Sequence, residues 1–525
     1  MRSLLLYRGL FLVLRFQLGS AFNHADCVAH TAQAHINGHS SVPDSVCEWL
    51  GIPYASPPTG QLRFASPTKL DLKGPINADH YGFDCPQTPS SPFAYPNATS
   101  QYLRIYGNFV NQLNNTQSED CLTLNVWSRR YKSPRRLKPV LVWIHGGRFS
   151  AGSSHTPFYH GGNLAGAQDV VVVTFNFRMN IFGFPGSPET ARNIGFLDQH
   201  FAVGWVHENM AAFGGDPARI TIVGQSSGAA AVSNWAYAFR DNPIVAGTMS
   251  HSGSIFSFPL LDAAVAATNW GHVASALGCG ESDSALSCMR SENISFQSIL
   301  TAVRAVPSVP GNSPARAVPP FQATVDNATA FPVSEYISRL RSGAFAPVPH
   351  LQIHGDHESG FYRISALAQG RALPEREWDD FELETFTCAA AAETYWRSRA
   401  GVPTYRARYL ADWNNLRLYD PPSSGAYHGV EVNMVTGNSE AVSGIAPEPG
   451  EVELSEVMQE AWAAFAAEPK RGLLALGWPR YRAGGESLVR LGVHSTSMVD
   501  VVSSAMYDGA CPALDLSFWD VSIPS

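Results

Sequence analysis

Residues 220–230, ITIVGQSSGAA, place a Gly-x-Ser-x-Gly pattern directly after a run of β-branched and apolar residues. A run of this kind is typical of a strand that is buried on both faces. Gly224 and Gly228 would allow a turn sharp enough to leave the Ser226 hydroxyl exposed above the sheet edge, near the positive end of a following helix. The pattern alone is common, so its position after a buried strand is what makes Ser226 a candidate nucleophile.

Two further runs, residues 139–144 and 170–175, have the same character of a buried strand. Residues 193–213, which precede the strand at 220–223, carry apolar residues roughly at helical spacing. A second apolar stripe covers residues 454–465 and predicts a helix that ends before Pro469. Strand, helix and strand in succession predict a parallel sheet with right-handed crossovers.

Composition narrows the class of protein. The chain has 525 residues, 45% of them hydrophobic and only 15% charged, which predicts a large buried interior and excludes disorder and coiled coil. The net charge is −8 and no run is rich in Lys or Arg, which excludes a nucleic-acid binder. No apolar stretch reaches the ~18 residues that span a bilayer.

The N-terminus predicts a signal peptide over residues 1–21. Arg2 precedes apolar residues 4–6 and 10–14, and small side chains at 19–21 suit a signal peptidase. Arg8 and Arg15 interrupt and flank the apolar region, so a retained amphipathic segment stays an alternative. Beyond it, neither a repeat nor a domain boundary is visible, and the Pro-rich stretch 306–320 is typical of a surface loop. We therefore expect one large domain over residues 22–525.

Cysteines and glycosylation acceptors favour export. The eight cysteines contain no CxxC pair, which suits disulfides better than zinc or redox chemistry. Four Asn-x-Ser/Thr sequons add candidate glycosylation sites at Asn97, Asn114, Asn293 and Asn327. Together with the N-terminus, these features predict a secreted, extracellular protein.

A serine nucleophile needs an imidazole to take its proton and a carboxylate to hold that imidazole. In α/β-hydrolases these residues follow in the order Ser, acid, His. A predicted strand at 348–353 leads into a loop that offers Asp356 or Glu358 as the acid. The histidines further along are His428, in a glycine-flanked loop, and His494, whose apolar neighbours favour a structural role.

The same loop also invites a metal interpretation. His354, Asp356, His357 and Glu358 are suitable zinc ligands by residue type. The helical HExxH spacing is absent and no distant ligand is evident, so we expect neither a metal nor another cofactor.

The third requirement is a set of N–H groups for the oxyanion that forms on the attacked carbonyl. The strand at 139–144 runs into His145-Gly146-Gly147-Arg148-Phe149, which is similar to an HGGG-type oxyanion turn. Its peptide N–H groups at Gly147 and Arg148, together with that of Ser227, are the predicted donors.

Several motifs resemble the type-B carboxylesterase/lipase family, which includes fungal lipases, carboxylesterases and cholinesterases. They lie at residues 51–64, 118–126, 213–217 and 251–254. The resemblance covers nearly the whole chain after the predicted signal peptide. It implies an α/β-hydrolase fold, with a central, mostly parallel sheet flanked by helices on both faces. It also implies that Ser226 is the nucleophile, Glu358 the acid and His428 the base.

The resemblance further implies disulfide pairs. These are Cys85 with Cys121, Cys279 with Cys288, and Cys388 with Cys511, which leaves Cys27 and Cys47 to pair with each other. The segment between Cys85 and Cys121 corresponds to a lid in related lipases and to the rim of the gorge in cholinesterases.

Departures from the family bear on the substrate. Gln225 and Ser227 stand where the family usually has Glu and Ala, and Arg148 replaces the third oxyanion glycine. Residues 85–121 contain no Trp to form a cation–π wall for choline, so we do not expect a cholinesterase.

The sequence thus predicts a serine hydrolase that acts on a small-molecule or lipid ester through an acyl-enzyme. Acyl transfer to an alcohol or amine would use the same residues, and a binding module that has lost catalysis would share the fold. The sequence leaves the ester and the oligomeric state open.

Overall fold

The computed structural model describes residues 27–511, apart from 42–44, 73, 89–92, 112, 131–135, 281–283 and 309–317. The predicted signal peptide and much of the Pro-rich stretch 306–320 lie outside these residues. Among the helices described, none is long and apolar enough to cross a membrane.

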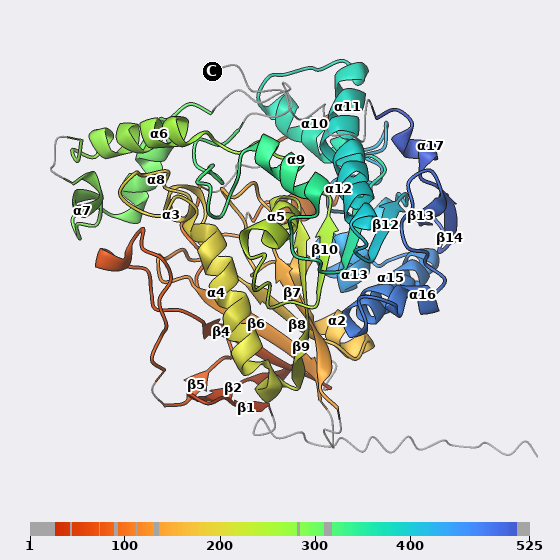
Figure 1. Ribbon diagram of the computed structural model, residues 1–525, viewed down its shortest axis with the longest axis horizontal. Helices are drawn as coiled ribbons and strands as arrows, with labels where there is room; N and C mark the ends of the chain where they lie inside the picture. The colour runs from red at the N-terminus through yellow and green to blue at the C-terminus, as the bar shows by residue number, and fades with distance from the viewer. Residues whose placement is uncertain are drawn as a thin grey trace, which may run out of the picture.

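An eleven-stranded sheet forms the centre of the described chain (Figure 1). Its strands, in the order in which they lie across the sheet, are β14 (Val499–Ser503), β13 (Glu486–Leu491), β12 (Thr404–Tyr409), β11 (His350–Gly355), β10 (Gly247–His251), β9 (Gly215–Gln225), β7 (Lys138–Ile144), β8 (Val171–Phe175), β6 (Thr123–Arg129), β4 (Val46–Pro53) and β3 (His39–Ser41). The strands from β13 to β8 pair in parallel, and the remaining neighbours pair antiparallel. Beside this sheet, β1 (Val28–His30), β2 (His35–Asn37) and β5 (Ile76–Asn77) form a small second sheet.

Helices follow and cover the strands. The α-helices of the described residues are α1 (Tyr102–Phe109), α2 (Gly162–Ala167), α3 (Asn180–Gly183), α4 (Ile194–Asn209), α5 (Ser227–Ala238), α6 (Ala263–Ala276), α7 (Ala285–Met289), α8 (Phe296–Arg304), α9 (Val333–Ser342), α10 (Ser359–Ala368), α11 (Glu375–Glu382), α12 (Cys388–Arg399), α13 (Val432–Thr436), α14 (Ser439–Ser443), α15 (Pro449–Ala467), α16 (Gly472–Ala475) and α17 (Ala505–Asp508). Short 3₁₀ turns lie at Gly60–Leu62, Pro157–Tyr159, Met210–Phe213 and Asn414–Leu416, and a π-helical turn lies at Leu383–Thr387.

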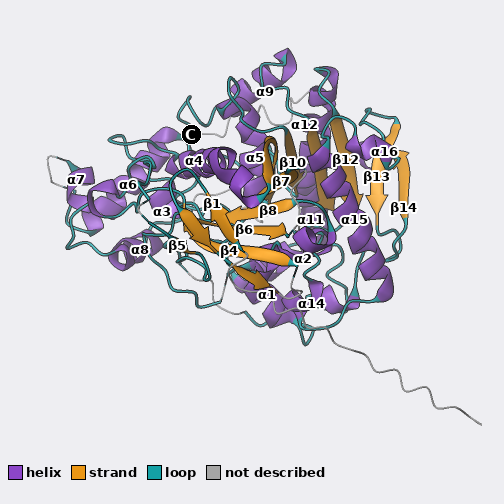
Figure 2. Ribbon diagram, turned by 90° about the horizontal axis from the view of Figure 1, so that it is seen from below, coloured by secondary structure: helices purple, strands orange, loops and turns teal. Residues whose placement is uncertain are grey.

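Both faces of the sheet are buried, which explains why its central strands are continuously apolar. In β7, Leu141 and Trp143 belong to the core on the side of α15, whereas Val140 and Val142 belong to the core on the side of α4 and α5. Figure 2 shows the strands between these two layers of helices. The strands predicted at 139–144, 170–175 and 220–223 are confirmed as parts of β7, β8 and β9, and the helix predicted at 454–465 as part of α15. The helix predicted at 193–213 is α4 followed by a 3₁₀ turn. The architecture is the predicted α/β-hydrolase fold.

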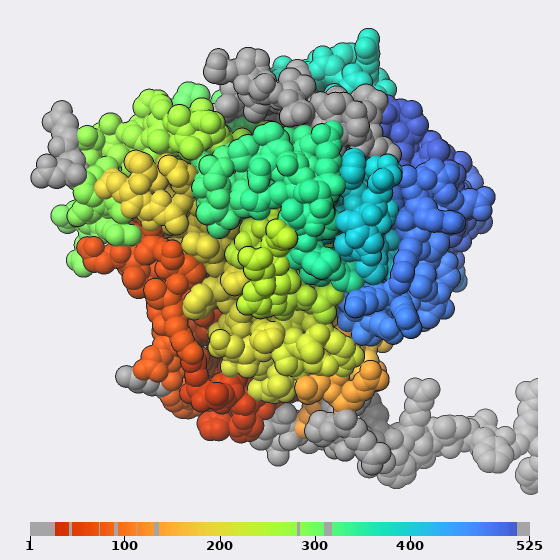
Figure 3. Space-filling view, in the orientation of Figure 1, coloured from red at the N-terminus to blue at the C-terminus, as the bar shows by residue number. Residues whose placement is uncertain are grey.

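The described chain contains four disulfides, whose cysteines lie 9 to 123 residues apart in the sequence. They are Cys27–Cys47, Cys85–Cys121, Cys279–Cys288 and Cys388–Cys511. The last three are the pairs that the family resemblance implies, and Cys27–Cys47 is the pair that was left by elimination. In the space-filling view the early, middle and late segments of the chain pack side by side into one body (Figure 3).

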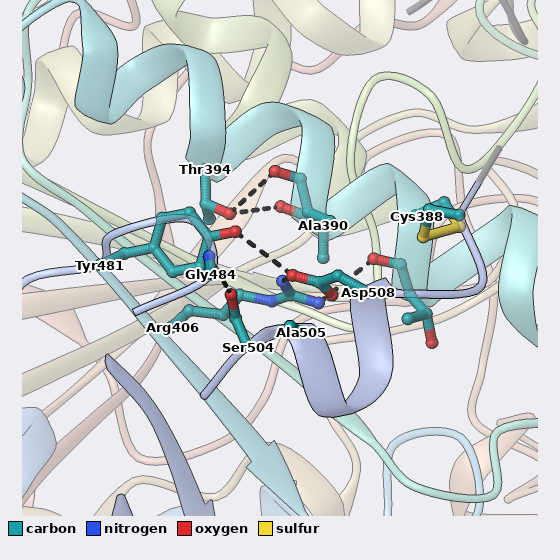
Figure 4. Close-up of polar contacts among 12 residues, drawn as sticks. Cys388, Ala390, Thr394, Arg406, Tyr481, Gly484, Ser504, Ala505 and Asp508 are labelled. Atoms are coloured by element: carbon teal, nitrogen blue, oxygen red, sulfur yellow. Dashed lines mark hydrogen bonds and ion pairs between the residues drawn. A yellow bond between two sulfur atoms is a disulfide. The ribbon is translucent and has the colours of Figure 1, made fainter. Parts of the chain in front are cut away.

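Buried polar contacts join the end of the described chain to β12, and a disulfide joins it to α12 (Figure 4). Arg406 Nη1 lies 2.6 Å from Asp508 Oδ2, to which the Tyr481 hydroxyl also donates at 3.3 Å. The disulfide from Cys388 reaches Cys511 just beyond α17. We call the contacts of Arg406, Tyr481 and Asp508 the C-terminal clamp.

Candidate active site

Ser226 stands at the turn between β9 and α5. Its φ of 58° and ψ of −122° lie in a region that L residues rarely adopt, as a sharp strand-to-helix turn requires. A Cβ on Gly224 would lie 2.2 Å from the carbonyl oxygen of Gly228, and a Cβ on Gly228 would lie 2.2 Å from that of Ile144. The turn therefore depends on both glycines of the Gly-x-Ser-x-Gly pattern.

His428 and Glu358 form a buried hydrogen-bonded pair. Nδ1 of His428 lies 2.6 Å from Oε2 of Glu358, and the two residues are 2% and 1% exposed. Oε1 of Glu358 accepts hydrogen bonds from the Gly355 N–H at 2.6 Å and from the Ser252 hydroxyl at 2.7 Å. Burial raises the pKa of Glu358, while His428 acts in the opposite direction. Three donors favour the carboxylate form, so Nδ1 of His428 carries a proton and Nε2 is free to accept one.

The other candidates for the acid and the base have different surroundings. Asp356 is partly exposed, and its carboxylate accepts a hydrogen bond from Nε of Arg408 at 2.6 Å. His494 is exposed in the turn that follows β13. Of the residues that the sequence left open, the structure brings Glu358 and His428 together.

The four residues of the metal interpretation have separate partners. Nε2 of His354 lies 3.1 Å from a guanidinium nitrogen of Arg408, and Nδ1 of His357 lies 3.4 Å from Glu382. In the part of the chain that the structure describes, no group of three or more His, Cys, Asp or Glu side chains could hold a metal ion.

Gln225 connects the imidazole to the turn after β7. Its Nε2 lies 3.1 Å from Nε2 of His428, and its Oε1 accepts a hydrogen bond from the Tyr159 hydroxyl at 3.3 Å. The Gly146 N–H donates in turn to that hydroxyl at 3.4 Å. Since Nε2 of His428 is an acceptor, the Gln225 amide donates to it. A Glu in place of Gln225 would instead put a carboxylate oxygen against the imidazole.

Tyr362 supplies the second contact to the imidazole. Its hydroxyl lies 3.2 Å from Nε2 of His428. Across the described residues, the hydrogen-bond partners of this nitrogen are Gln225 and Tyr362, and not Ser226. In active sites without a substrate, the hydrogen bond between nucleophile and base is often long or poorly aligned, and it tightens when the substrate binds.

A second buried acid, Glu431, lies behind the pair. Its Oε1 is 3.2 Å from Nδ1 of His251, whose Nε2 accepts a hydrogen bond from the Trp462 indole at 2.9 Å. This pattern is that of the neutral Nδ1–H tautomer of His251. Ser252 Oγ lies 3.4 Å from Glu431 as well as 2.7 Å from Glu358, so one hydroxyl contacts both acids.

The predicted oxyanion turn passes directly beside Ser226. A Cβ on Gly146 would lie 3.0 Å from the Cβ of Ser226. At Gly147, φ is 112° and a Cβ would lie 1.9 Å from the carbonyl oxygen of Ala151, so a glycine is required there. Burial lowers the pKa of His145, at the start of the turn, to about 4, which keeps this side chain neutral.

Two residues with side chains follow in the left-handed region. Arg148 has a φ of 58° and Phe149 a φ of 56°. The Phe149 N–H donates to the Ser227 hydroxyl at 3.3 Å. This bond joins the turn to the first residue of α5, and it gives the unusual Ser227 a structural role.

Two adjoining pockets lie beside this turn. The first is lined by Arg148 and Ser227 and by aromatic and apolar side chains that include Phe149, Phe258 and Phe381. The second shares Phe149 and Phe258 with it and extends toward α5. The walls of both pockets are largely apolar.

Aromatic rings surround the imidazole of His428. The ring centroids of Tyr362, Phe386 and Phe109 lie 5.0, 5.3 and 6.2 Å from its own. Phe109 is the last residue of α1, inside the loop closed by the Cys85–Cys121 disulfide. That loop, which lacks Trp, thus contributes a Phe to the wall around His428.

The asparagines of the four sequons, Asn97, Asn114, Asn293 and Asn327, are all exposed. Their glycosylation stays a prediction.

Sequence reasoning missed Tyr159, Tyr362 and Glu431. Tyr362 could have been found, because it follows Glu358 by four residues at the start of α10 and therefore lies on the same side of that helix. Glu431 follows His428 by three residues, so its place in the sequence was a comparable signal. Tyr159 has none, since only the packing of distant segments brings it to the site.

The chain is similar to known esterases and to a lipase in sequence, and to an esterase in fold. Residues 25–395 match the model of the carboxylesterase family. The chain is 32% identical to a chlorogenic acid esterase of Aspergillus niger, over 93% of this chain and 94% of that protein. It is 30% identical to secreted lipase 5 of Gibberella zeae, over 88% and 89% of the two chains. A solved structure of PNB esterase has the same fold, with a TM-score of 0.73 and 24% identity over 91% of this chain and 97% of that one.

Proposed function

Because this chain belongs to the carboxylesterase family and is a carboxylic ester hydrolase, we propose that it works through an acyl-enzyme on Ser226. In this proposal His428 is the general base and acid, and Glu358 orients it. The N–H groups of Gly147, Arg148 and Ser227 stabilise the oxyanion.

One observation carries the proposal. The buried hydrogen bond of 2.6 Å between Glu358 and His428 leaves Nε2 of the imidazole as the acceptor, and this nitrogen contacts Gln225, the residue just before Ser226. A serine at a sharp turn, a neutral imidazole with its acceptor nitrogen toward that turn, and a carboxylate behind the imidazole are what nucleophilic acyl transfer needs.

The proposed reaction has two halves. In the first, Ser226 Oγ attacks the ester carbonyl as His428 Nε2 takes its proton, and the oxyanion lies against the N–H groups of the turn. The C–O bond to the alcohol then breaks, and His428 returns the proton to the leaving alcohol. In the second half, water attacks the acyl-enzyme with His428 again as the base, which releases the acid and restores Ser226.

We also propose that the protein is secreted. Four disulfides favour an oxidising compartment, and one relative is named a secreted lipase. The proposal includes cleavage after residue 21 and glycosylation at the four sequons. Expression in a fungal host, followed by N-terminal sequencing of the protein in the medium, tests it, and a product found only inside the cell would contradict it.

Replacement of the nucleophile tests the chemistry. Ser226→Ala should abolish hydrolysis of 4-nitrophenyl butyrate and labelling by a fluorophosphonate, because it removes the hydroxyl that forms the acyl-enzyme. Ser342→Ala, at an exposed serine of α9, is the matched control and should retain both. Undiminished activity in Ser226→Ala would contradict the proposal.

A competing nucleophile separates hydrolysis from acyl transfer. With added methanol, a hydrolase should still give mainly the free acid, whereas a transferase should give mainly the methyl ester. The ratio of these two products, measured by chromatography, decides between them.

A further inference from the structure

The oxyanion turn folds back on itself, and this fold sets the direction of one of its donors. The Gly147 carbonyl oxygen accepts hydrogen bonds from the N–H groups of Ser150 and Ala151, each at 3.1 Å. The Gly147 carbonyl and the Arg148 N–H belong to one planar trans peptide group and point in opposite directions. The bonds to that carbonyl therefore also orient the Arg148 N–H, which is a predicted oxyanion donor.

Gln87 holds the next residue of this turn, Gly152, by both of its backbone polar groups. The Gly152 N–H donates to Gln87 Oε1 at 2.9 Å, and Gln87 Nε2 donates to the Gly152 carbonyl oxygen at 2.9 Å. Gln87 is only 3% exposed. A carboxamide carries a donor and an acceptor side by side, so it can pair with one backbone residue as a neighbouring strand would.

Gly152 is in close contact with the start of the turn. A Cβ on Gly152 would lie 2.5 Å from the carbonyl oxygen of Gly146 and 2.5 Å from Nδ1 of His145. Gly152 also follows directly after Ala151, whose N–H donates to the Gly147 carbonyl. A displacement of Gly152 would therefore reach the peptide group that carries the Arg148 N–H.

The segment that contains Gln87 is itself held in place. Cys85, two residues earlier, forms the disulfide with Cys121 and accepts a further hydrogen bond from Gln87 Nε2 at 3.2 Å through its carbonyl oxygen. The Gln87 N–H donates to Oε1 of Gln117, near the other end of the loop that this disulfide closes, at 2.9 Å. Gln87 thus extends from a fixed support.

Neighbours of Gln87 make two further links to the turn. The buried carboxylate of Asp84 accepts a hydrogen bond from the Ser153 hydroxyl. Nδ2 of Asn180 donates to the carbonyl oxygens of Pro86 at 2.8 Å and Ser150 at 3.3 Å. The base of the disulfide-closed loop therefore contacts the turn at several points, and Gln87 makes the most direct contact with its backbone.

We propose that Gln87 is a positioning residue for the oxyanion turn. Its carboxamide fixes Gly152 and so directs the Arg148 N–H at the oxyanion, without touching the substrate itself. This inference rests on the proposed function, in which that N–H stabilises the oxyanion. Because the negative charge forms only as the carbonyl is attacked, the effect of Gln87 should appear in kcat more than in KM.

A pair of substrates that differ in one atom reports on the oxyanion donors. 4-Nitrophenyl butyrate has a carbonyl oxygen where O-4-nitrophenyl thionobutyrate has a sulfur, and sulfur is a weak hydrogen-bond acceptor. The readout is the ratio of kcat/KM for the ester to kcat/KM for the thionoester. A variant that merely contains less folded enzyme loses activity on both substrates alike, so this ratio does not change.

Gln87→Met removes the donor and the acceptor but keeps a side chain of similar length. We expect it to lower kcat/KM for 4-nitrophenyl butyrate about tenfold to hundredfold, mainly through kcat, and to lower the ratio about tenfold. Gln87→Glu keeps an acceptor for the Gly152 N–H but loses the donor to the Gly152 carbonyl, so it should lower the ratio less.

Gln101→Met is the matched control. Gln101 lies in the same disulfide-closed loop and is also buried, but its Nε2 donates to the carbonyl oxygens of Asn414 at 2.8 Å and Arg417 at 3.2 Å. Its removal takes away the same kind of bond without a contact to the turn. The ratio of this variant should stay within about twofold of that of the natural enzyme.

The outcomes separate this inference from the proposed function. If the natural enzyme is active and Gln87→Met keeps the ratio of the natural enzyme, Gln87 supports only the fold and the inference is wrong. If Gln87→Met does not fold, the ratio of Gln87→Glu decides in the same way. If the natural enzyme hydrolyses neither ester and resists a fluorophosphonate, the proposed function itself fails.

Discussion

Two buried regions of this molecule contain ionisable groups, and they differ in how the charges are matched. In the C-terminal clamp, the buried Arg406 pairs with Asp508. Within α12, Arg397 pairs in the same way with Glu393 at 2.9 Å, with both side chains fully buried. In the candidate active site, the hydrogen bonds to Glu358 come from neutral donors and from the imidazole of His428.

The type of partner that a buried carboxylate has indicates whether it contributes to stability or to catalysis. A carboxylate that pairs with an arginine is neutralised by a cation that does not give up its proton. Such a pair can link two segments of the chain, but it cannot transfer a proton. A carboxylate held by a hydroxyl, a peptide N–H and an imidazole keeps a partner whose protonation state can change. Substitutions in the clamp should therefore change stability, and substitutions around Glu358 should change catalysis.

The largest effect is expected at Glu358. Glu358→Gln should lower kcat/KM for 4-nitrophenyl butyrate about 10⁴-fold, because an amide cannot stabilise the imidazolium or fix its tautomer. Asp356→Asn, in the same loop, should change kcat/KM by less than about tenfold, since Asp356 contacts Arg408. Steady-state kinetics on both variants test the assignment, and the reverse order of effects would refute it.

The second effect concerns the clamp. Arg406→Met should lower the free energy of unfolding by about 3–5 kcal/mol, because it leaves Asp508 buried without its counter-ion. The kcat of the molecules that remain folded should not change. Urea denaturation measures the loss, with Arg339→Met as the control, since the half-exposed pair of Arg339 and Glu335 should contribute less than about 1 kcal/mol. Equal losses in the two variants would remove the distinction between the regions.

The third effect depends on pH and involves His350, in β11. Both ring nitrogens of the neutral imidazole have a hydrogen-bond partner. Nδ1 lies 2.9 Å from the Thr248 hydroxyl, and Nε2 lies 3.0 Å from Oε1 of Gln352. Burial, with a contribution from Arg397, lowers the pKa of His350 to about 4. The unfolded chain, with a pKa of about 6.5, binds this proton first, so stability is present above that pH and is lost as the pH falls toward 4.

Between pH 7 and pH 5, His350 should therefore account for a loss of about 2 kcal/mol in the free energy of unfolding. His350→Gln should weaken this pH dependence by that amount. Urea denaturation of both proteins at the two pH values measures it, and parallel losses would show that His350 does not contribute.

The smallest effect is expected at Ser252. Ser252→Ala removes the hydroxyl that donates to Glu358 at 2.7 Å, and it should lower kcat/KM about tenfold, with little change in KM. Ser250→Ala, in β10, removes a hydroxyl that contacts the Ala229 carbonyl instead, and should leave kcat/KM within about twofold. An equal loss of activity in both would indicate a general effect on β10 and not on the acid.

The fold and part of the candidate site could be predicted because the sequence patterns that indicate them involve residues close together in the chain. A continuous apolar run followed by Gly-x-Ser-x-Gly depends on neighbours in the sequence, and the structure has β9, the turn and α5 at that place. The choice between Asp356 and Glu358 was not local. Two residues apart in the chain, Asp356 pairs with Arg408 of β12, whereas Glu358 contacts His428.

By itself, the sequence determined several central strands, two of the helices, the sharp turn at Ser226 and the set of candidate partners, because periodicity, glycine sterics and residue type act over short distances. Only the tertiary structure decided that Gln225, Tyr159 and Tyr362 connect the imidazole to its surroundings, that Phe109 comes from the disulfide-closed loop, and that Arg148 lines a pocket. The physical reason is that these contacts join segments far apart in the chain. Their geometry is set by how the sheet and its two helical layers pack.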